Sequence, residues 1–288
     1  MTAEVRWPAA DRETETSRPA DAGRKRDWRR PALVWDVLRE VLAARSAGTG
    51  RQELDIVDVG GGTGGFAVEL AELGHRVTVV DLSPDALAAA QRRAAERQVS
   101  LTAVQGEADA LDSLVGTGTA DLVICHNVLE YVDSPAAAMG AIARVLAPGA
   151  SVSVLAANAV AAVLQRALAG RYDQARELLT AAEAERTGET ERAAETASGA
   201  GTAPNRTAGD PRRFTLAGLT ALIEGAGLTV GDAHGIRVFS GLLPAADADP
   251  SSPADLRILE DAAASYPALR DIAARLHVLA KKHSLGSK

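Results

Sequence analysis

The sequence predicts an α/β fold whose mostly parallel β-sheet is covered by helices on both faces. Short apolar runs of strand length alternate with amphipathic stretches between residues 54 and 158. Five glycines within six residues follow the first of these runs, and two of the amphipathic stretches begin with Ser-Pro. Short apolar strands that alternate with helices are typical of a parallel sheet buried on both faces.

The elements follow from this alternation. A first helix is expected at 31–45, where apolar residues recur at helical spacing until Gly-Thr-Gly at 48–50 ends it. Ser83 and Ser134 each precede a proline, a pattern that favours an N-cap followed by the first helical residue. The next helices are expected at 65–74, 83–98 and 134–149, and the first five strands at 54–60, 75–81, 100–106, 120–126 and 151–158.

The pattern changes after the fifth strand. A helical cap is expected over 159–214, beginning with one long helix at 159–179. Residues 181–213 contain no Val, Ile, Leu, Met or aromatic residue, so they are predicted to be a disordered or loosely helical insertion. Beyond it we expect a helix at 215–227, strands near 228–240, helical periodicity over 253–276 and a last strand at 276–282, within a seven-stranded sheet.

Composition narrows the class of protein. Residues 1–25 are predicted to be a disordered arm and 26–288 to form one domain. The single cysteine, Cys125, excludes a disulfide framework and a cysteine-based zinc site, and no metal site is expected. We see no signal peptide or membrane span, so a cytoplasmic location without a membrane partner is expected. The net charge of −7 does not favour nucleic-acid binding, and the oligomeric state is open.

The glycine cluster predicts a nucleotide-binding turn. Gly60 and Gly62 fit both the dinucleotide spacing, completed by Gly65, and a second spacing, completed by Gly64. In both patterns glycine lets the backbone turn tightly after a strand and approach the ligand closely. Asp81 ends the next strand 21 residues after Gly60, where a carboxylate can accept hydrogen bonds from ribose hydroxyls. The glycines alone leave a dinucleotide and S-adenosylmethionine open.

Further segments resemble the class I S-adenosylmethionine-dependent methyltransferases. Asp58 precedes the glycines to give D-x-G-x-G-x-G, "VQGEADAL" at 104–111 resembles the adenine segment, and 121–134 with 141–150 resemble the fourth strand and the following helix. A dehydrogenase would need a second mononucleotide-binding half, which the sequence does not show. The resemblance implies a Rossmann-like seven-stranded sheet and S-adenosylmethionine as cofactor.

The chain is also similar to one subgroup, the tRNA 5-carboxymethoxyuridine methyltransferases, whose members esterify the carboxylate of a modified wobble uridine. "LVICHNVLEYV", "AGRYD", "GIRVF" and "LHVLAKK" occur in the same order there, over about 30–282. The resemblance implies that Arg30 contacts the cofactor carboxylate, Asp81 the ribose, and His126 the methionyl part. Its cofactor-binding residues are Arg30, Asp58, Gly60, Gly61, Gly62, Asp81, Leu82, Ala108, Asp109 and His126. From the residues alone, Arg30 fits a solvated basic flank equally well; Asp109 could also be a cap and His126 a structural histidine, although the functional interpretation is favoured for these two.

The acceptor is less constrained than the cofactor. A carboxylate is ionised at neutral pH and needs no general base, so no catalytic residue is singled out. The expected substrate-binding residues are Asn127, Tyr131, Arg212, Arg213 and Arg237. The chain departs from the subgroup in its acidic stretch 183–210. Carboxylates repel phosphate, so this stretch does not favour a tRNA acceptor. Three hypotheses therefore stand: methylation of tRNA, methylation of a small metabolite, and an inactive cofactor-binding regulator.

Overall fold

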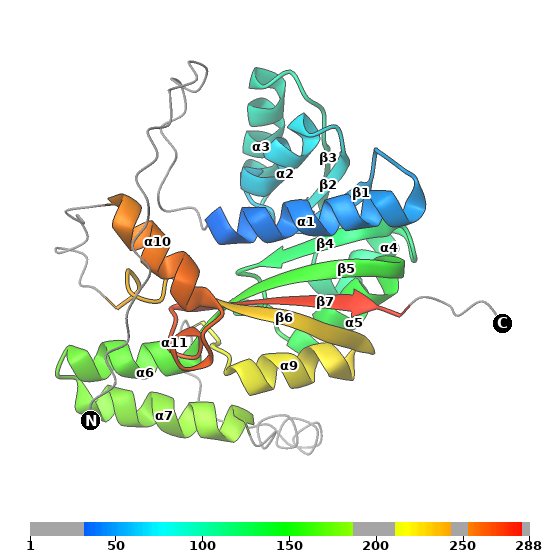
Figure 1. Ribbon diagram of the computed structural model, residues 1–288. Helices are drawn as coiled ribbons and strands as arrows, with labels where there is room; N and C mark the ends of the chain where they lie inside the picture. The colour runs from blue at the N-terminus through cyan, green and yellow to red at the C-terminus, as the bar shows by residue number, and fades with distance from the viewer. Residues whose placement is uncertain (1–31, 187–210, 243–252, 284–288) are drawn as a thin grey trace, which may run out of the picture. The chain divides into compact units, whose positions relative to one another are not determined.

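The computed structural model describes residues 32–186, 211–242 and 253–283, and its core is one seven-stranded sheet (Figure 1). The strands lie in the order β3-β2-β1-β4-β5-β7-β6. The first five are parallel, and β7 runs antiparallel to both β5 and β6. The strands are β1 Asp55–Val59, β2 Arg76–Asp81, β3 Thr102–Gln105, β4 Ala120–His126, β5 Leu146–Ala157, β6 Leu228–Ile236 and β7 Arg275–Lys282. The predicted mostly parallel sheet with helices on both faces is confirmed.

Helices connect the strands. They are α1 Ala32–Thr49, α2 Gly65–Glu72, α3 Pro84–Glu96, the 3-10 turn η1 Ala108–Ala110, α4 Leu111–Val115, α5 Pro135–Val145, α6 Ala159–Leu168, α7 Tyr172–Arg186, α9 Leu216–Gly225, α10 Pro253–Ala264 and α11 Pro267–Arg270. The Ser-Pro starts are as predicted: the hydroxyls of Ser83 and Ser134 accept the backbone N–H groups of Ala86 and Ala137, both at 3.2 Å. Among the described helices, none combines the length and apolarity needed to cross a bilayer.

Four predicted boundaries were wrong. The expected long helix at 159–179 is two helices, because Gly170 adopts a positive φ of 70° that ends the first. The expected helix over 134–149 stops at Val145, and β5 begins at once at Leu146. The periodicity after Pro253 is broken at Pro267, which starts a separate short helix.

The remaining difference concerns the low-complexity segment. The predicted insertion at 181–213 begins inside α7, which continues to Arg186. Residues 187–210 lie outside the described part of the chain, as does the predicted arm at 1–25. Residues 211–213 are an extended segment that leads into Phe214.

Two apolar layers fill the two faces of the sheet. One layer packs α5 and α9 against the sheet through residues such as Met139, Ile142 and Leu219. The other packs α1 and α2 through residues such as Leu38 and Leu70. Cys125 lies inside the first layer, and burial raises the pKa of its thiol. Its predicted place in the core is therefore confirmed.

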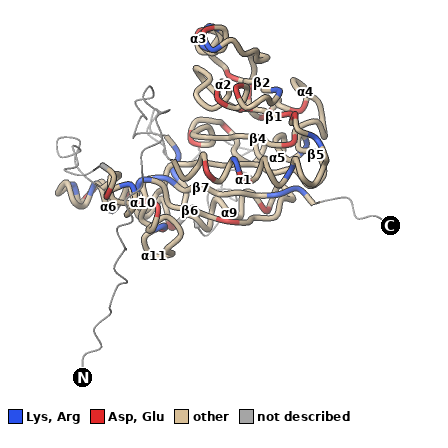
Figure 2. Tube along the Cα trace, turned by 45° about the horizontal axis from the view of Figure 1, so that its top comes forward, with Lys and Arg blue, Asp and Glu red and all other residues tan. Residues whose placement is uncertain are grey.

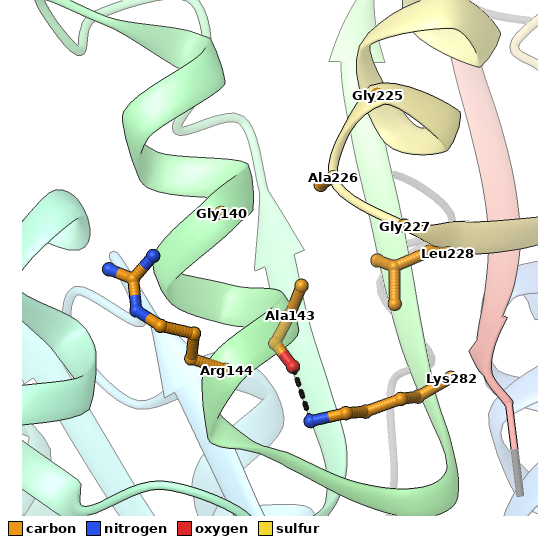
Figure 3. Close-up of a pocket in the computed structure, with 8 residues that line it drawn as sticks. All are labelled: Gly140, Ala143, Arg144, Gly225, Ala226, Gly227, Leu228 and Lys282. Atoms are coloured by element: carbon orange, nitrogen blue, oxygen red, sulfur yellow. Dashed lines mark hydrogen bonds between the residues drawn. The ribbon is translucent and has the colours of Figure 1, made fainter.

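A shallow cavity of about 420 Å³ lies between α5 and the start of β6 (Figure 3). Lys282 lines it and donates its Nζ to the carbonyls of Ala143 and Leu146, at 2.8 and 2.7 Å. A cation at this position neutralises the last carbonyls of α5. The cavity lies where the parallel strands begin, which is the edge opposite to the one at which ligands of such sheets bind.

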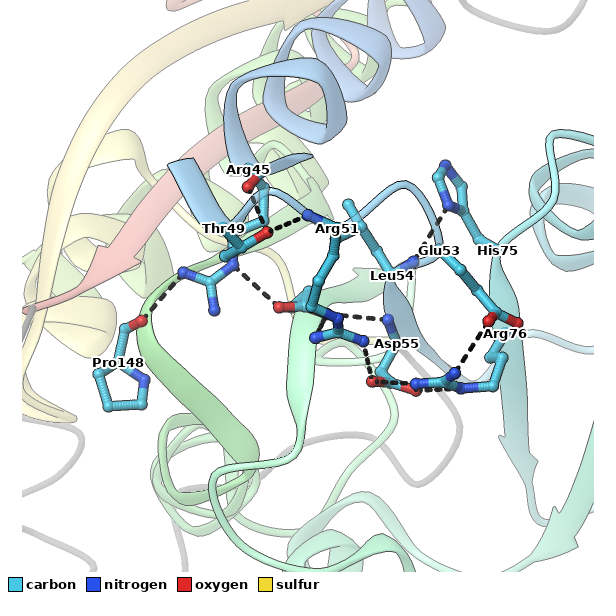
Figure 4. A network of polar contacts seen from close by, with 10 residues as sticks. Arg45, Thr49, Arg51, Glu53, Leu54, Asp55, His75, Arg76 and Pro148 are labelled. Atoms are coloured by element: carbon cyan, nitrogen blue, oxygen red, sulfur yellow. Dashed lines mark hydrogen bonds and ion pairs between the residues drawn. The ribbon is translucent and has the colours of Figure 1, made fainter. Parts of the chain in front are cut away.

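Asp121 of β4 is a buried acceptor that connects this strand to α1 and β1. Figure 4 shows its partners Arg45, Arg51 and Asp55 within a polar network. The Asp121 side chain is 1% exposed and accepts from Arg45 Nε at 2.9 Å and Arg51 Nη1 at 2.8 Å. The backbone N–H of Asp55 donates to the same carboxylate at 2.9 Å. Arg45 also donates to the carbonyl of Pro148, so this network ties the first helix to the base of the sheet.

Candidate active site

The predicted cofactor residues gather where β1, β2 and β4 end. Strand order reverses beside β1, because β2 lies on one side of it and β4 on the other. In open α/β sheets, ligands bind outside the carboxyl ends of the strands at such a switch point. The glycine turn follows β1, Asp81 ends β2 and His126 ends β4, so all three meet at this edge.

The turn after β1 requires glycine for two reasons. Gly60 and Gly62 have φ values of 63° and 54°, a conformation in which other residues are strained. A Cβ atom at Gly60 would also lie 2.4 Å from a methyl group of Val128, and one at Gly61 would lie 2.6 Å from Asp58 Oδ2. The turn therefore packs closely against Val128 and Asp58, and glycine is needed there for space as well as for its positive φ.

Asp81 is fixed by the turn that it faces. Its Oδ2 accepts the backbone N–H of Gly62 at 2.9 Å, and its Oδ1 accepts that of Ser83, also at 2.9 Å. A carboxylate has about four acceptor positions, so two remain for hydroxyl donors. The geometry suits the predicted contact with a ribose.

Replacing Asp81 by alanine is expected to weaken binding of S-adenosylmethionine about ten- to a hundredfold, because a charged acceptor is worth roughly 1.5–3 kcal/mol. Calorimetric titration of the folded variant measures this loss. Asp85→Ala is the matched control, since Asp85 is an exposed aspartate at the start of α3. Equal binding by wild type and Asp81→Ala would show that the ribose is held elsewhere.

Asp58 lies beneath the turn and is only 3% exposed. Burial raises the pKa of its carboxyl to about 7, the charge of Asp81 adds to this rise, and a hydrogen bond from the backbone of Ala67 opposes it. Asp58 supports the turn from below, since it occupies the space that a side chain at Gly61 would need.

Leu82, a predicted cofactor residue, follows β2, and the predicted adenine segment contains η1. Leu82 is exposed, and its carbonyl accepts Gln105 Nε2 at 3.1 Å. Ala108 is buried and Asp109 exposed in the 3-10 turn, whose N-cap is Glu107. The backbone N–H of Gly106 donates to the carbonyl of Asp81 at 3.2 Å and holds this segment beside β2.

His126 ends β4 in a buried position. Its Nε2 lies 2.8 Å from Ser153 Oγ, whereas its Nδ1 is buried and has no hydrogen-bond partner among the described residues. The ring of Phe66 packs edge-on against it, with centroids 4.9 Å apart, and stacks in turn on Trp35. Burial lowers the pKa of His126 to about 3, so its imidazole is neutral at physiological pH.

A guanidinium and a buried carboxylate lie next to His126 on the acceptor side. Asn127 has a φ of 59°, and its Oδ1 accepts Nη1 of Arg275. The same Nη1 lies 3.4 Å from Oε1 of Glu130, which is 2% exposed and also accepts the N–H of Ala157. Burial raises the pKa of Glu130, and its Oε2 is buried with no partner among the described residues. Arg275 and Glu130 were not among the predicted site residues.

The extended segment 211–214 runs along this acceptor side. Arg212 donates its backbone N–H to the carbonyl of Glu130 at 3.0 Å and its Nη1 to the carbonyl of Val132 at 3.1 Å. Phe214 joins the end of β5 by donating to Ala157 at 2.8 Å. The predicted pair Arg212 and Arg213 is therefore brought to the same edge as Asn127.

Two other predicted residues are placed less decisively. Tyr131 is exposed in the turn after β4, between Glu130, which contacts Arg275, and Val132, whose carbonyl accepts Arg212. Arg237 is exposed beyond the end of β6, with a φ of 61°, and its carbonyl accepts the N–H groups of Gly241 and Ala274. It lies on the same edge, but two strands beyond β5. Arg30 is outside the described residues.

The residues at this edge fit S-adenosylmethionine. At Gly62 the protein atom nearest to a Cβ position is the Gly60 carbonyl oxygen, 4.0 Å away, so a ligand can come close to the backbone there, and Asp81 retains acceptor positions for hydroxyls. The partnerless Nδ1 of His126 is a buried polar atom that a bound ligand could satisfy. The individual contacts remain predictions.

Comparison with known sequences supports this interpretation. A family profile described as a methyltransferase domain matches residues 57–154. The chain is 34% identical over 150 residues to the tRNA 5-carboxymethoxyuridine methyltransferase of Escherichia coli (strain K12), covering 50% of this chain and 54% of the relative. It is 33% identical over 125 residues to a ubiquinone biosynthesis O-methyltransferase of Xanthomonas oryzae pv. oryzae (strain PXO99A), covering 43% and 51%. The chain thus spans about half the length of the curated relatives it matches.

Solved structures share the fold. An S-adenosylmethionine-dependent methyltransferase from Mesorhizobium loti matches with a TM-score of 0.51 and 20% identity, over 86% of this chain and 97% of that one. The cyclase SpnF matches with a TM-score of 0.53 and 19% identity, over 90% and 86%. At these identities the likeness shows the fold alone, and the cyclase shows that the fold does not fix the reaction. The sequence matches therefore show a methyltransferase domain over residues 57–154 of this chain, within a Rossmann-like fold.

Proposed function

We propose that this protein transfers the methyl group of S-adenosylmethionine to an anionic, carboxylate-type oxygen of an acceptor that binds beside Arg275. The observation that carries the proposal is the position of this guanidinium, held by Asn127 and Glu130 at the edge where β4 and β5 end. Both contacts use Nη1, so within the described part of the chain Nε and Nη2 are left for an incoming anion. A guanidinium binds carboxylate best through two parallel N–H groups.

The cofactor would lie across the carboxyl ends of β1, β2 and β4. The glycine turn with Asp81 would hold the adenosine part, and His126 would lie beside the methionyl part. The cofactor supplies a methyl group already activated by its sulfonium. The protein's residues then have to align the acceptor oxygen for in-line displacement and exclude water.

Charge on the acceptor side supports an anionic acceptor. Arg212 and Arg213 reach this edge in the segment 211–214, where Arg212 donates its backbone N–H to the carbonyl of Glu130, the residue that also contacts Arg275. A buried or half-buried anion needs cations to offset its lost hydration, and guanidinium groups can supply them. A carboxylate acceptor is already ionised when it binds. On the acceptor side, burial raises the pKa of Glu130, and its carboxylate lies against Arg275.

The relatives leave two acceptor classes, a tRNA nucleotide and a small metabolite. Figure 2 shows basic and acidic positions interspersed along the described elements. In the tRNA-modifying subgroup, lysines stand where this chain has its acidic stretch 183–210. Carboxylates repel phosphate, so this difference favours the small acceptor. A cofactor-binding regulator without catalysis remains the third hypothesis.

Arg275→Ala is expected to lower kcat/KM for the acceptor about ten- to a hundredfold and to leave the Kd for S-adenosylmethionine unchanged, because a charge-assisted pair is worth roughly 1.5–3 kcal/mol. Arg275→Lys should recover little, since an ammonium cannot replace two parallel N–H donors. Arg97→Ala is the control, because Arg97 pairs with Glu72 on the surface beyond α3.

The acceptor is identified by following labelled methyl groups from S-adenosylmethionine into purified tRNA and into a metabolite extract. Transfer to tRNA should fall steeply with added salt, whereas transfer to a small acceptor should change little. Cofactor binding without transfer to either pool would favour the regulator. Full transfer by Arg275→Ala would contradict the proposed anion site.

A further inference from the structure

Four polar side chains, one from each of four neighbouring strands, form a continuous row across the sheet. His126 Nε2 of β4 lies 2.8 Å from Ser153 Oγ of β5, which lies 2.9 Å from His277 Nε2 of β7. His277 Nδ1 lies 3.4 Å from His234 Nδ1 of β6, and the two rings are stacked. The row shares its face of the sheet with Leu155, which pairs with His277 and packs in the apolar layer under α1.

The row is buried at its inner end, His126, and opens toward the surface at its outer end, His234. Ser153 and His277 are fully buried, His126 is 9% exposed, and His234 is half-buried at the edge strand. Polar groups placed in an apolar layer are costly unless each is hydrogen-bonded. Every member is satisfied along the row, but His126 Nδ1 at the inner end has no partner among the described residues.

The number of protons restricts the row to two arrangements. A neutral imidazole has one donor and one acceptor, and the buried Ser153 hydroxyl has one proton to donate. When that proton is used inside the row, all three hydrogen bonds point the same way. If they point toward His234, His126 Nδ1 is an acceptor. If they point toward His126, its Nδ1 carries the proton and is a donor.

We propose that Ser153, His277 and His234 are positioning residues that set the proton on His126, so that protonation of His234 converts His126 Nδ1 from acceptor to donor. A protonated His234 can only donate to His277 Nδ1. His277 Nε2–H then donates to Ser153, and the Ser153 hydroxyl donates to His126 Nε2. Each proton of the row moves one position toward His234: His277 Nδ1 gives its proton to His234, Ser153 gives its proton to His277 Nε2, and His126 Nε2 gives its proton to Ser153. His126 Nδ1 takes up the one added proton from solvent, so His126 changes tautomer without becoming charged and the added charge lies on His234.

The surroundings of each histidine define where this change occurs. Burial lowers the pKa of His234, Arg270 of α11 lowers it further, and Asp232 of its own strand and Glu40 of α1 raise it. His277 is held neutral by burial and by its two histidine neighbours, which also lower its pKa. His126 stays neutral because burial lowers its pKa to about 3. The change is therefore expected below pH 6.5, when His234 takes up a proton.

The consequence concerns the proposed cofactor site, on which this inference rests. The methionyl ammonium of the cofactor is a donor without an acceptor position. An acceptor at His126 Nδ1 suits it, whereas a donor there opposes it. Cofactor affinity should therefore fall as pH falls through the titration of His234.

Two variants distinguish the effect of the row on cofactor affinity from the effect of other groups that titrate in the same pH range. Asp58, with a pKa of about 7, is such a group and lies beneath the glycine turn. Ser153→Ala breaks the row in its middle, and Ser151→Ala is the matched control two residues earlier on the same strand and face. His234→Gln removes the outer titrating group at a half-buried position that should tolerate it. The probe is S-adenosylhomocysteine, titrated calorimetrically at about pH 7.5 and 5.5.

Wild type and Ser151→Ala should lose about tenfold more affinity between the two pH values than Ser153→Ala and His234→Gln, since one pKa unit of coupling corresponds to tenfold. Nitrogen-15 NMR of the imidazoles in the cofactor-free protein should show His126 Nδ1 gaining a proton as His234 titrates. An unchanged His126 tautomer, or equal pH dependence in all four proteins, would overturn the row as a relay. Failure of S-adenosylhomocysteine to bind at either pH would instead count against the proposed function, because the NMR measurement does not depend on the ligand.

Discussion

Replacing Asp121 by asparagine is expected to lower the free energy of unfolding by about 3 kcal/mol, toward the lower end of the cost of breaking a buried ion pair. Asp121 is 1% exposed and is the shared acceptor of Arg45, Arg51 and the N–H of Asp55. The neutral amide leaves Arg45 without its counter-charge and leaves Arg51 paired with Asp55 alone. Partial exposure of the two arginines, 18% and 41%, moderates the cost.

Urea unfolding at about pH 7.5 measures this loss. The control is Asp36→Asn, which removes an ion pair with Arg39 whose members are 55% and 59% exposed. Surface pairs of this kind contribute about 0–1 kcal/mol. If Asp121→Asn cost no more than Asp36→Asn, the network of Figure 4 would not hold α1 to the sheet.

Asp58→Asn is expected to have the opposite effect at alkaline pH, raising the free energy of unfolding at about pH 8 by up to about 4 kcal/mol. Burial raises the pKa of Asp58 from its usual 3.8 to about 7 in the folded chain. Between these values the folded state binds the proton more tightly than the unfolded state. The stability of the wild type therefore falls as pH rises through this window and is constant above it.

Asparagine has no proton to lose, and its side-chain oxygen can still accept from the backbone of Ala67. The variant should match wild type near pH 4 and exceed it at pH 8, which urea unfolding at both values tests. Asp121→Asn serves as the comparison, because it should be less stable than wild type at neutral and alkaline pH alike. A parallel pH dependence of wild type and Asp58→Asn would contradict the raised pKa.

The contrast between these two aspartates marks what the sequence could not predict. Both stand in apolar strands, and the resemblance of the motif around Gly60 to the methyltransferases implied that Asp58 is a cofactor residue. Only the structure shows that Asp121 meets two arginines from the end of α1 and the loop after it, whereas Asp58 is buried beside another acid. The partners of a buried charge come from distant parts of the chain, and no local pattern encodes them.

The sequence by itself determined the order of the elements and the cofactor edge. Apolar runs of strand length, Ser-Pro starts and clustered glycines are local signals, because period, capping and positive φ depend on neighbouring residues. They placed the glycine turn, Asp81 and His126 at the carboxyl ends of three strands of a parallel sheet. The errors lie at boundaries such as Gly170 and Leu146, where competing local preferences are close in energy.

The tertiary structure alone decided what surrounds that edge. Arg275 begins a strand far along the chain from Asn127 and Glu130, and only the antiparallel pairing of β7 with β5 brings them together. Ser153, His277 and His234 likewise become one row because β5, β7 and β6 are neighbours in the sheet. Contacts across strands depend on register and strand order, which are set by packing of the whole sheet rather than by any one segment.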